Sequence, residues 1–239
     1  GRTRALAIDR TNENIILAGG VSGGLYRSED AGATWTRITT QFQHPSITCI
    51  VQDPRPGKDI IWYYGTGEAI GNSARATGAP FEGNGIYRSF NGGRAFWPAR
   101  STENTDVNTG EAFDFVSNIV VHPSTGHVYA STLGGVFKST NLGRNFSEVI
   151  ASEFFNWTDV IVTPSGVLNA SVEAASPLSG MYTSTDGDNW TPITPQGWYP
   201  STGRTVMGFA PSSENILYTL SEDTDGGLGF LWEYNADSV

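Results

Sequence analysis

The sequence has a single cysteine, so it cannot form an intrachain disulfide. Cys49 lies in the apolar run at residues 47–51, which predicts a buried strand and a small hydrophobic role rather than a reactive thiol. No apolar run approaches the roughly 18 residues needed to span a membrane, and no charged-then-apolar leader opens the sequence. No long stretch has helical periodicity. A disulfide-stapled domain and a helical domain are therefore excluded, and no transmembrane segment is expected.

Positive charge is also scarce. The chain has 14 Lys and Arg against 24 Asp and Glu, a net charge of −10. Such a surface repels a phosphate backbone and an anionic bilayer alike, so nucleic acid is not expected as a partner.

Glycine and aromatic residues are plentiful, with 29 glycines and 12% aromatics, whereas charged residues make up only 16%. This composition is typical of many short strands joined by tight turns. At 239 residues the chain can also bury a substantial core. The sequence therefore predicts an all-β fold.

One turn motif occurs four times: a Ser, then Asp or Asn two residues on, then an aromatic, with Gly at the fifth position in three copies. We call these segments the box turns. Their defining residues are Ser28, Asp30, Gly32 and Trp35; Ser89, Asn91, Gly93 and Phe96; Ser139, Asn141, Gly143 and Phe146; and Ser184, Asp186 and Trp190. We expect the Asp or Asn to accept hydrogen bonds from the following backbone N–H groups, the Gly to take a positive φ, and the aromatic to plug the space between layers. Because every unit repeats them, these residues are interpreted as structural rather than catalytic.

Apolar strands flank each box turn, so each unit reads as a four-stranded antiparallel meander. A lone meander leaves edges and an apolar face uncovered, and radial stacking of such blades in a β-propeller solves this problem. The expected blades cover residues 1–40, 41–100, 101–151, 152–195 and 196–239, with the last one incomplete. We therefore predict a single, partial propeller of about four and a half to five blades, belonging to a longer chain.

The motif S-x-D-x-G-x-x-W resembles the Asp-box, or bacterial neuraminidase repeat, of β-propellers. With residues 1–9, 19–28 and 65–68, the chain also resembles large secreted bacterial proteins described as sortilin-like or BNR-repeat glycosyl hydrolases, many exported by the type IX pathway. Sortilin-type receptors of animal cells carry a cysteine-rich module that has no counterpart here. The resemblance implies a secreted or cell-surface bacterial protein, but such repeats occur in hydrolases, receptors and assembly factors alike.

A ligand of such a propeller would meet the face formed by the loops from the second to the third strand and from one blade to the next. These loops carry carboxylates and aromatics, the combination that sugar binding requires, and two cationic residues. The candidate ligand-binding residues are Glu68, Arg75, Phe81, Glu111, Asp114, Trp157, Glu173, Trp198, Tyr199 and Arg204.

The sequence can be compared with the catalytic motifs of enzymes that share the resemblance. The Arg-Ile-Pro entry motif of sialidases is absent, and Arg27 and Arg88 occupy repeated structural positions. Xyloglucan hydrolases of this fold have a motif similar to Thr-Asp-x-Gly-Gly-x-Tyr-Arg before their first box, and its Asp is catalytic. In this sequence Val21 occupies the position of that Asp. Residues 223–227 resemble only part of a calcium loop, so neither a metal nor a cofactor is expected. The catalytic residues stay unassigned.

The sequence thus favours a binding or scaffold module for a glycan or an extracellular protein. Two alternatives stay open. A glycoside hydrolase would place two carboxylates in a deep, aromatic-lined cleft of the loop face or in further sequence, whereas a passive spacer of a large secreted assembly would have no concave site.

Overall fold

The computed structural model describes residues 2–69, 80–103, 110–152, 157–173, 178–198, 204–223 and 227–238. Nearly all of the regular structure is β, as predicted. The three helices within the described residues are single 3-10 turns: η1 (Arg100–Thr102), η2 (Ala112–Asp114) and η3 (Ala236–Ser238). None of them is long or apolar enough to cross a membrane.

The strands form five antiparallel sheets, in each of which neighbours in sequence are neighbours in space. Blades 1 and 2 are β1 (Thr3–Ile8), β2 (Ile16–Gly20), β3 (Gly24–Ser28), β4 (Thr36–Arg37), and β5 (Ile47–Gln52), β6 (Trp62–Thr66), β7 (Ile86–Ser89), β8 (Trp97–Pro98). Blades 3 and 4 are β9 (Val116–Val121), β10 (Val128–Thr132), β11 (Gly135–Ser139), β12 (Ser147–Ala151), and β13 (Thr158–Val162), β14 (Leu168–Val172), β15 (Gly180–Ser184), β16 (Thr191–Pro192). Blade 5 has three strands in the described chain, β17 (Thr205–Ala210), β18 (Ser213–Glu222) and β19 (Leu228–Asn235).

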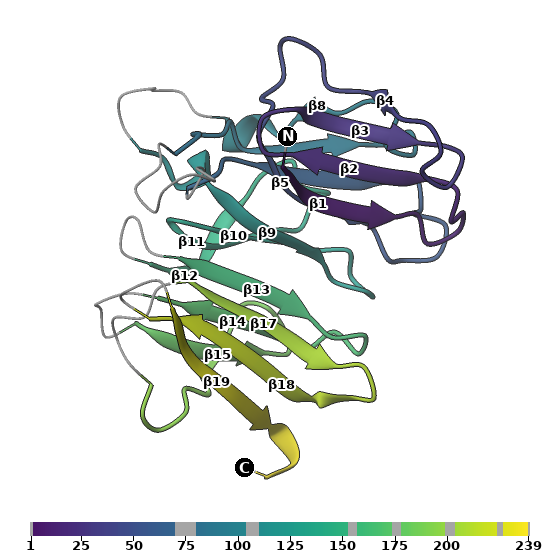
Figure 1. The fold of residues 1–239 in the computed structure, drawn as a ribbon. Coiled ribbons are helices and arrows are strands. Elements are labelled where there is room, and N and C mark those ends of the chain that lie inside the picture. Colours follow the sequence, from purple (N-terminus) through teal and green to yellow (C-terminus); the bar gives the residue numbers. More distant parts are fainter. Residues whose placement is uncertain are drawn as a thin grey trace.

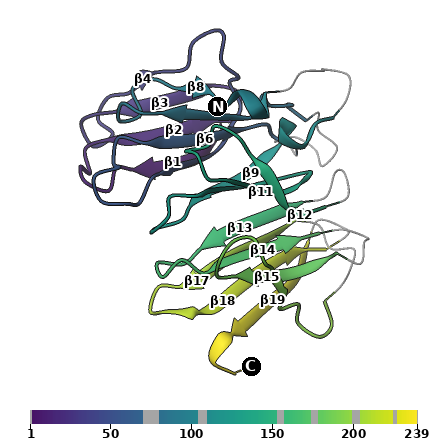
Figure 2. The same ribbon diagram turned by 180° about the vertical axis from the view of Figure 1, so that it is seen from behind.

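The first strands of the five blades lie side by side, in the order β1, β5, β9, β13, β17. Each blade therefore packs face to face on the next around a common axis, and its later strands point outward. Figure 1 shows the five sheets following one another along an open arc, and the view from behind in Figure 2 shows the N- and C-terminal residues at opposite ends of it. Four complete blades and an incomplete fifth were predicted, and the described residues confirm this prediction.

The core lies between blades rather than inside them. Between blades 1 and 2 the Tyr64 and Tyr87 rings stack at 4.8 Å, and both are buried. Gly65 lets blade 3 approach blade 2, since a Cβ there would lie 2.6 Å from Val116 Cγ1. Cys49 is buried in this second interface, where desolvation raises the pKa of its thiol to about 12. Its predicted role as a small core residue is confirmed.

The box turns form the predicted hydrogen bonds. In the first of them Asp30 Oδ1 accepts from the Thr34 N–H at 2.8 Å, and Ser28 Oγ accepts from the Gly32 N–H at 2.9 Å. Gly32 has a φ of +90°, the conformation for which glycine was expected. The preceding Ala31 also has a positive φ of 54°, which sequence reasoning missed.

The expectation that each box aromatic plugs an inter-blade space is wrong for the first repeat. Phe96 is buried between blades 1 and 2, but the Trp35 side chain is 41% exposed. The position of blade 1 explains the difference: in the described chain no blade precedes it, so nothing packs against that face.

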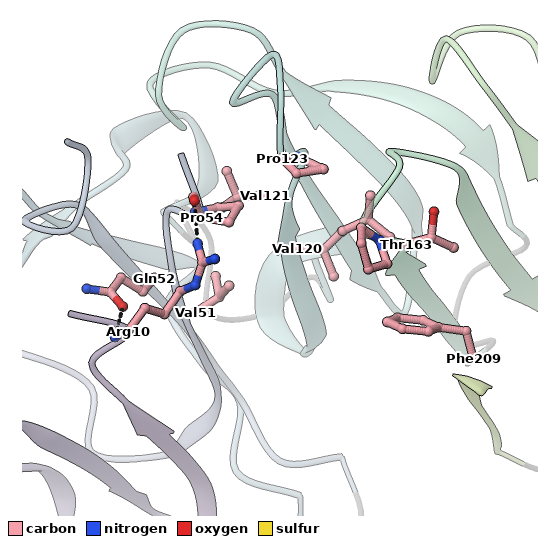
Figure 3. Close-up of a pocket in the computed structure, with 11 residues that line it drawn as sticks. Arg10, Val51, Gln52, Pro54, Val120, Val121, Pro123, Thr163 and Phe209 are labelled. Carbon is pink, nitrogen blue, oxygen red and sulfur yellow. Dashed lines mark hydrogen bonds between the residues drawn. The ribbon is translucent and has the colours of Figure 1, made fainter. Parts of the chain in front are cut away.

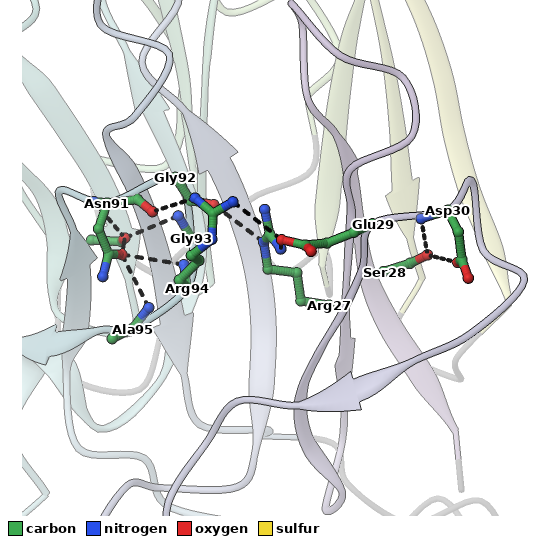
Figure 4. Close-up of polar contacts among 10 residues, drawn as sticks. Arg27, Ser28, Glu29, Asp30, Asn91, Gly92, Gly93, Arg94 and Ala95 are labelled. Carbon is green, nitrogen blue, oxygen red and sulfur yellow. Dashed lines mark hydrogen bonds and ion pairs between the residues drawn. The ribbon is translucent and has the colours of Figure 1, made fainter.

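Each of the first three blades also reaches into the box turn of the next blade through a cation on its third strand. Arg27 Nε donates to Gly92 O at 3.2 Å, Arg88 Nη1 to Leu142 O at 3.1 Å, and Lys138 Nζ to Asp186 O at 3.3 Å. Figure 4 shows the first of these contacts, where Arg27 lies between its own turn and the turn that holds Gly92. The repeated cations therefore lock neighbouring blades together.

Candidate functional site

The candidate residues were expected on one face of the propeller, and the strand pairing of the described residues shows why such loops meet there. The first strand of each blade starts opposite the end of the second, as in the pairs Ile47↔Thr66, Thr158↔Val172 and Thr205↔Ser221. Residues just before a first strand and just after a second strand therefore share one end of the axis. We call this end the loop face.

Glu68 is almost fully buried at this face, with only 1% of its side chain exposed. Its Oε1 lies 2.8 Å from Arg4 Nη1, and its Oε2 lies 3.7 Å from Arg2 Nη2. Burial lowers the pKa of the Arg4 guanidinium, whereas Glu68 acts in the opposite direction. Two cations at the start of β1 thus compensate a carboxylate that follows β6.

The backbone before Glu68 needs glycine. Gly67 has a φ of +96°, and a Cβ there would lie 1.8 Å from Asp114 O. Beyond it, Glu68 and Phe81 form an isolated antiparallel bridge, with 2.8 Å hydrogen bonds in both directions. The bridge holds Phe81 at the surface, where 46% of the residue is exposed.

Trp157 and Arg204 form the second part of the site. Each immediately precedes a first strand, and the Arg204 guanidinium carbon lies 5.5 Å from the centroid of the Trp157 ring. Both side chains line a crevice that also contacts Arg4, Glu68 and Thr48. The volume of this crevice is about 10 Å³, which is space for about one water molecule. Side chains therefore fill the axis at this end, and no sugar ring fits inside.

Glu173 follows β14 and is 3% exposed. Burial raises the pKa of its carboxyl to about 9, against opposing contributions from the Thr205 hydroxyl and the Arg204 charge. The carboxyl is therefore protonated at neutral pH. A neutral, buried carboxylic acid at this face can donate a hydrogen bond or a proton.

Asp159, inside β13, is a buried acid that sequence reasoning missed. Burial raises the pKa of its carboxyl. Opposing contributions come from the Asn118 amide, at 3.1 Å from Oδ1, and from the Met207 N–H, at 3.2 Å from Oδ2. Its partners come from blades 3 and 5, so the group ties three blades together. Its place within a strand hid it, because only loop residues were considered.

The remaining candidates divide into structural and peripheral positions. Glu111 and Asp114 cap η2 reciprocally, and the Glu111 N–H donates to Asp114 Oδ2 at 2.6 Å. Trp198 is partly buried, and its Nε1 donates to Ser179 Oγ at 3.2 Å. Arg75 and Tyr199 lie outside the described residues. The structure thus brings Glu68, Trp157 and Arg204 into one crevice and leaves Trp198 out of it.

Metal binding has no support among the described residues, since no three His, Cys, Asp or Glu side chains cluster suitably there. Asp223, at the partial calcium-like loop, accepts a hydrogen bond from the Gly227 N–H at 2.6 Å, and residues 224–226 lie outside the description.

Comparison with known proteins gives the same architecture. No family model matches the chain. A xyloglucanase from Paenibacillus is 30% identical over 218 residues, 82% of this chain and 21% of that protein. The structure of an ancestral GH74 enzyme matches with a TM-score of 0.70 and 22% identity, over 98% of this chain and 33% of the other. The GH74 xyloglucanase from Xanthomonas campestris matches with a TM-score of 0.55 and 14% identity, over 99% and 44%.

The fold is a β-propeller. The chain spans about a fifth of the length of the xyloglucanase that it resembles in sequence, and about a third of the ancestral GH74 enzyme. Within this propeller, the position expected for the catalytic Asp of xyloglucan hydrolases is Val21, a buried residue whose N–H donates to Arg2 O at 3.0 Å. Blade 1 therefore offers an apolar side chain at that position.

Proposed function

We propose that the chain is a glycan-binding part of a secreted or cell-surface bacterial β-propeller. The observation that carries this proposal is the Trp157 ring, held by Arg204 at the rim of the loop face beside Arg4 and Glu68. An aromatic ring can cover the apolar face of a sugar, while neighbouring charged groups hydrogen-bond its hydroxyls. The crevice below is filled, so the glycan lies across the face, with exposed Phe81 as a second contact.

Xyloglucan is the first glycan to test, because the 30% identical relative is named a xyloglucanase. Affinity electrophoresis and calorimetry with soluble xyloglucan would compare the unaltered chain with Trp157→Ala. We expect roughly tenfold weaker binding in this variant, which is the loss of about 1.4 kcal/mol of aromatic contact. Trp97→Ala is the matched control, because Trp97 is 52% exposed on the outer strand β8. Equal losses in both variants, or no binding by the unaltered chain, would argue against the proposal.

Hydrolysis of the glycan is the second candidate function. It is favoured by the name of the relative and by Glu173, whose raised pKa of about 9 suits a general acid. Release of reducing ends from xyloglucan would be measured for the chain and for Glu173→Gln. Activity that disappears in this variant while xyloglucan binding persists would support a glycoside hydrolase. If the chain neither binds xyloglucan nor releases reducing ends from it, an extracellular protein ligand or a spacer role is favoured.

We also propose that the remainder of a longer chain covers the two ends of the arc. The Tyr26 and Trp35 side chains at one end, and Leu220 and Leu231 at the other, are each at least 36% exposed. In blade 2, Tyr87 and Phe96 occupy the positions of Tyr26 and Trp35, and both are buried against blade 1. An intact mass of the native protein well above 25.7 kDa would support this proposal, whereas a match to 25.7 kDa would contradict it.

A further inference from the structure

A second concavity lies at the opposite end of the propeller axis, where the first strands end. It has a volume of about 370 Å³, within the range of about 300–1,000 Å³ typical of small-molecule sites. Arg10 and Gln52 lie on one side of it and Phe209 on the other, with Val120 between them (Figure 3). We call it the axial pocket.

The walls of the axial pocket are apolar because the ends of the first strands carry valines and the turns that follow carry prolines. Val51 and Val120 hold equivalent positions in β5 and β9, each three residues before the proline of the following turn. Val162, the last residue of β13, corresponds to Val121, which also lines the pocket. The turn that follows each of these strands contains a proline, and the prolines Pro54, Pro123 and Pro164 line the mouth. Proline has no N–H, so this rim presents few donors to water. Phe209 adds an aromatic wall from blade 5.

Among the described residues that line the pocket, Arg10 has the one charged side chain. Its backbone N–H donates to Gln52 Oε1 at 2.8 Å, and its guanidinium donates to Pro54 O. Asp9 Oδ2 in turn accepts from Gln52 Nε2 at 2.9 Å, which fixes the glutamine. The guanidinium is therefore anchored at the rim, and it has five N–H donors, more than this one bond uses.

We infer that the axial pocket binds a small ring-containing molecule with a single carboxylate. The ring lies between the valines and Phe209, where it is desolvated, and the carboxylate pairs with Arg10. One anionic group is the limit, because the chain carries a net charge of −10 and Arg10 is the only cation among the described lining residues. This site is separate from the glycan proposal, since it uses none of the loop-face residues.

Two fluorescent probes test the inference: the anion 1-anilinonaphthalene-8-sulfonate and the neutral N-phenyl-1-naphthylamine. We expect both to bind at one saturable site, and 3-phenylpropionate to displace the anion better than 3-phenylpropanol does. Arg10→Gln should weaken the anionic probe roughly fivefold to tenfold and leave the neutral probe within twofold, because Arg10 contributes charge and not wall area.

Val162→Phe, which fills the pocket, should weaken both probes, and so should Phe209→Ala, which removes a wall. Thermal melting of each variant separates loss of the pocket from loss of the fold. Leu231→Ser is the control for adventitious apolar surface, because Leu231 is 68% exposed at the end of the arc. Probe binding that disappears in Leu231→Ser, or that persists unchanged in both folded pocket variants, would overturn the inference. Equal weakening of both probes by Arg10→Gln would also overturn it.

Discussion

The cation that joins blade 1 to blade 2 offers a sharp test of what stabilises the arc. Arg27→Met keeps the apolar stem of the side chain but removes the guanidinium, which donates to Gly92 O at 3.2 Å. The Arg27 side chain as a whole is 5% exposed. A net hydrogen bond to a charged donor stabilises a fold by about 1.5–3 kcal/mol, and the buried Gly92 carbonyl would lose this partner. We expect the free energy of unfolding to fall by about 2 kcal/mol. For a chain of this size the corresponding drop in Tm is roughly 4–8 °C.

Arg94→Met is the matched control. Arg94 Nη2 pairs with Glu29 Oε1 at 3.2 Å, and both side chains are about 60% exposed, so water and salt screen this ion pair. Its removal should cost no more than about 0.5 kcal/mol. Arg27 also pairs with Glu29, so Glu29→Gln removes both ion pairs of Glu29 but leaves the hydrogen bond from Arg27 to Gly92 O. Its loss of stability should be smaller than that of Arg27→Met.

The assay is thermal and urea unfolding followed by circular dichroism at low and high salt. The Arg27→Met loss should persist at high salt, since it comes from a buried hydrogen bond, whereas the small Arg94→Met loss should vanish. Equal Tm shifts in the two variants would refute the reasoning, because they would show that the contact across the blades adds nothing beyond a surface ion pair.

Two further predictions concern packing and pH. Gly65→Ala should destabilise the chain by about 1–3 kcal/mol in urea unfolding, because its Cβ would overlap Val116 and Cys49, whereas Gly208→Ala should be near neutral, since a Cβ at Gly208 meets nothing within 4 Å. The second concerns Glu173, whose folded-state pKa of about 9 lies above its ordinary value of 4.5. The folded chain then holds a proton that the unfolded chain releases, so stability falls as pH rises from about 4.5 to 9. Glu173→Gln should remove this fall, and the stability difference between variant and unaltered chain should grow by up to about 1.4 kcal/mol per pH unit. A constant difference between pH 5 and pH 9 would contradict the assignment.

The sequence predicted the repeated parts of the fold because their hydrogen bonds are local. Ser28 and Asp30 bond to N–H groups within four residues, so a short motif is enough to specify the turn. The alternation of apolar strands and turns likewise predicted the number of sheets. The exposed Trp35 shows the limit of this reasoning, because its burial depends on a neighbouring blade and not on its own repeat.

The loop face was predictable as a location but not as a set of contacts. Counting residues from each strand placed Glu68, Trp157 and Arg204 on one face, but their pairing joins blades that are distant in sequence. Arg4 was missed because it lies within the first strand, where it reads as an ordinary surface residue. Its contact with Glu68 depends on how blade 1 packs on blade 2, which the sequence of neither blade specifies by itself.

The two ends of the axis differ because of what the first strands carry at each end. At the loop face, the side chains around Glu68 leave a volume of only about 10 Å³ in the crevice. At the other end, the valines and prolines leave a volume of about 370 Å³. A six-residue strand such as β5 separates the two ends by roughly 20 Å. A ligand at one end therefore cannot touch residues at the other. Any effect of Trp157→Ala on probe binding in the axial pocket would have to pass through the packing of the blades, which the cations of the third strands join.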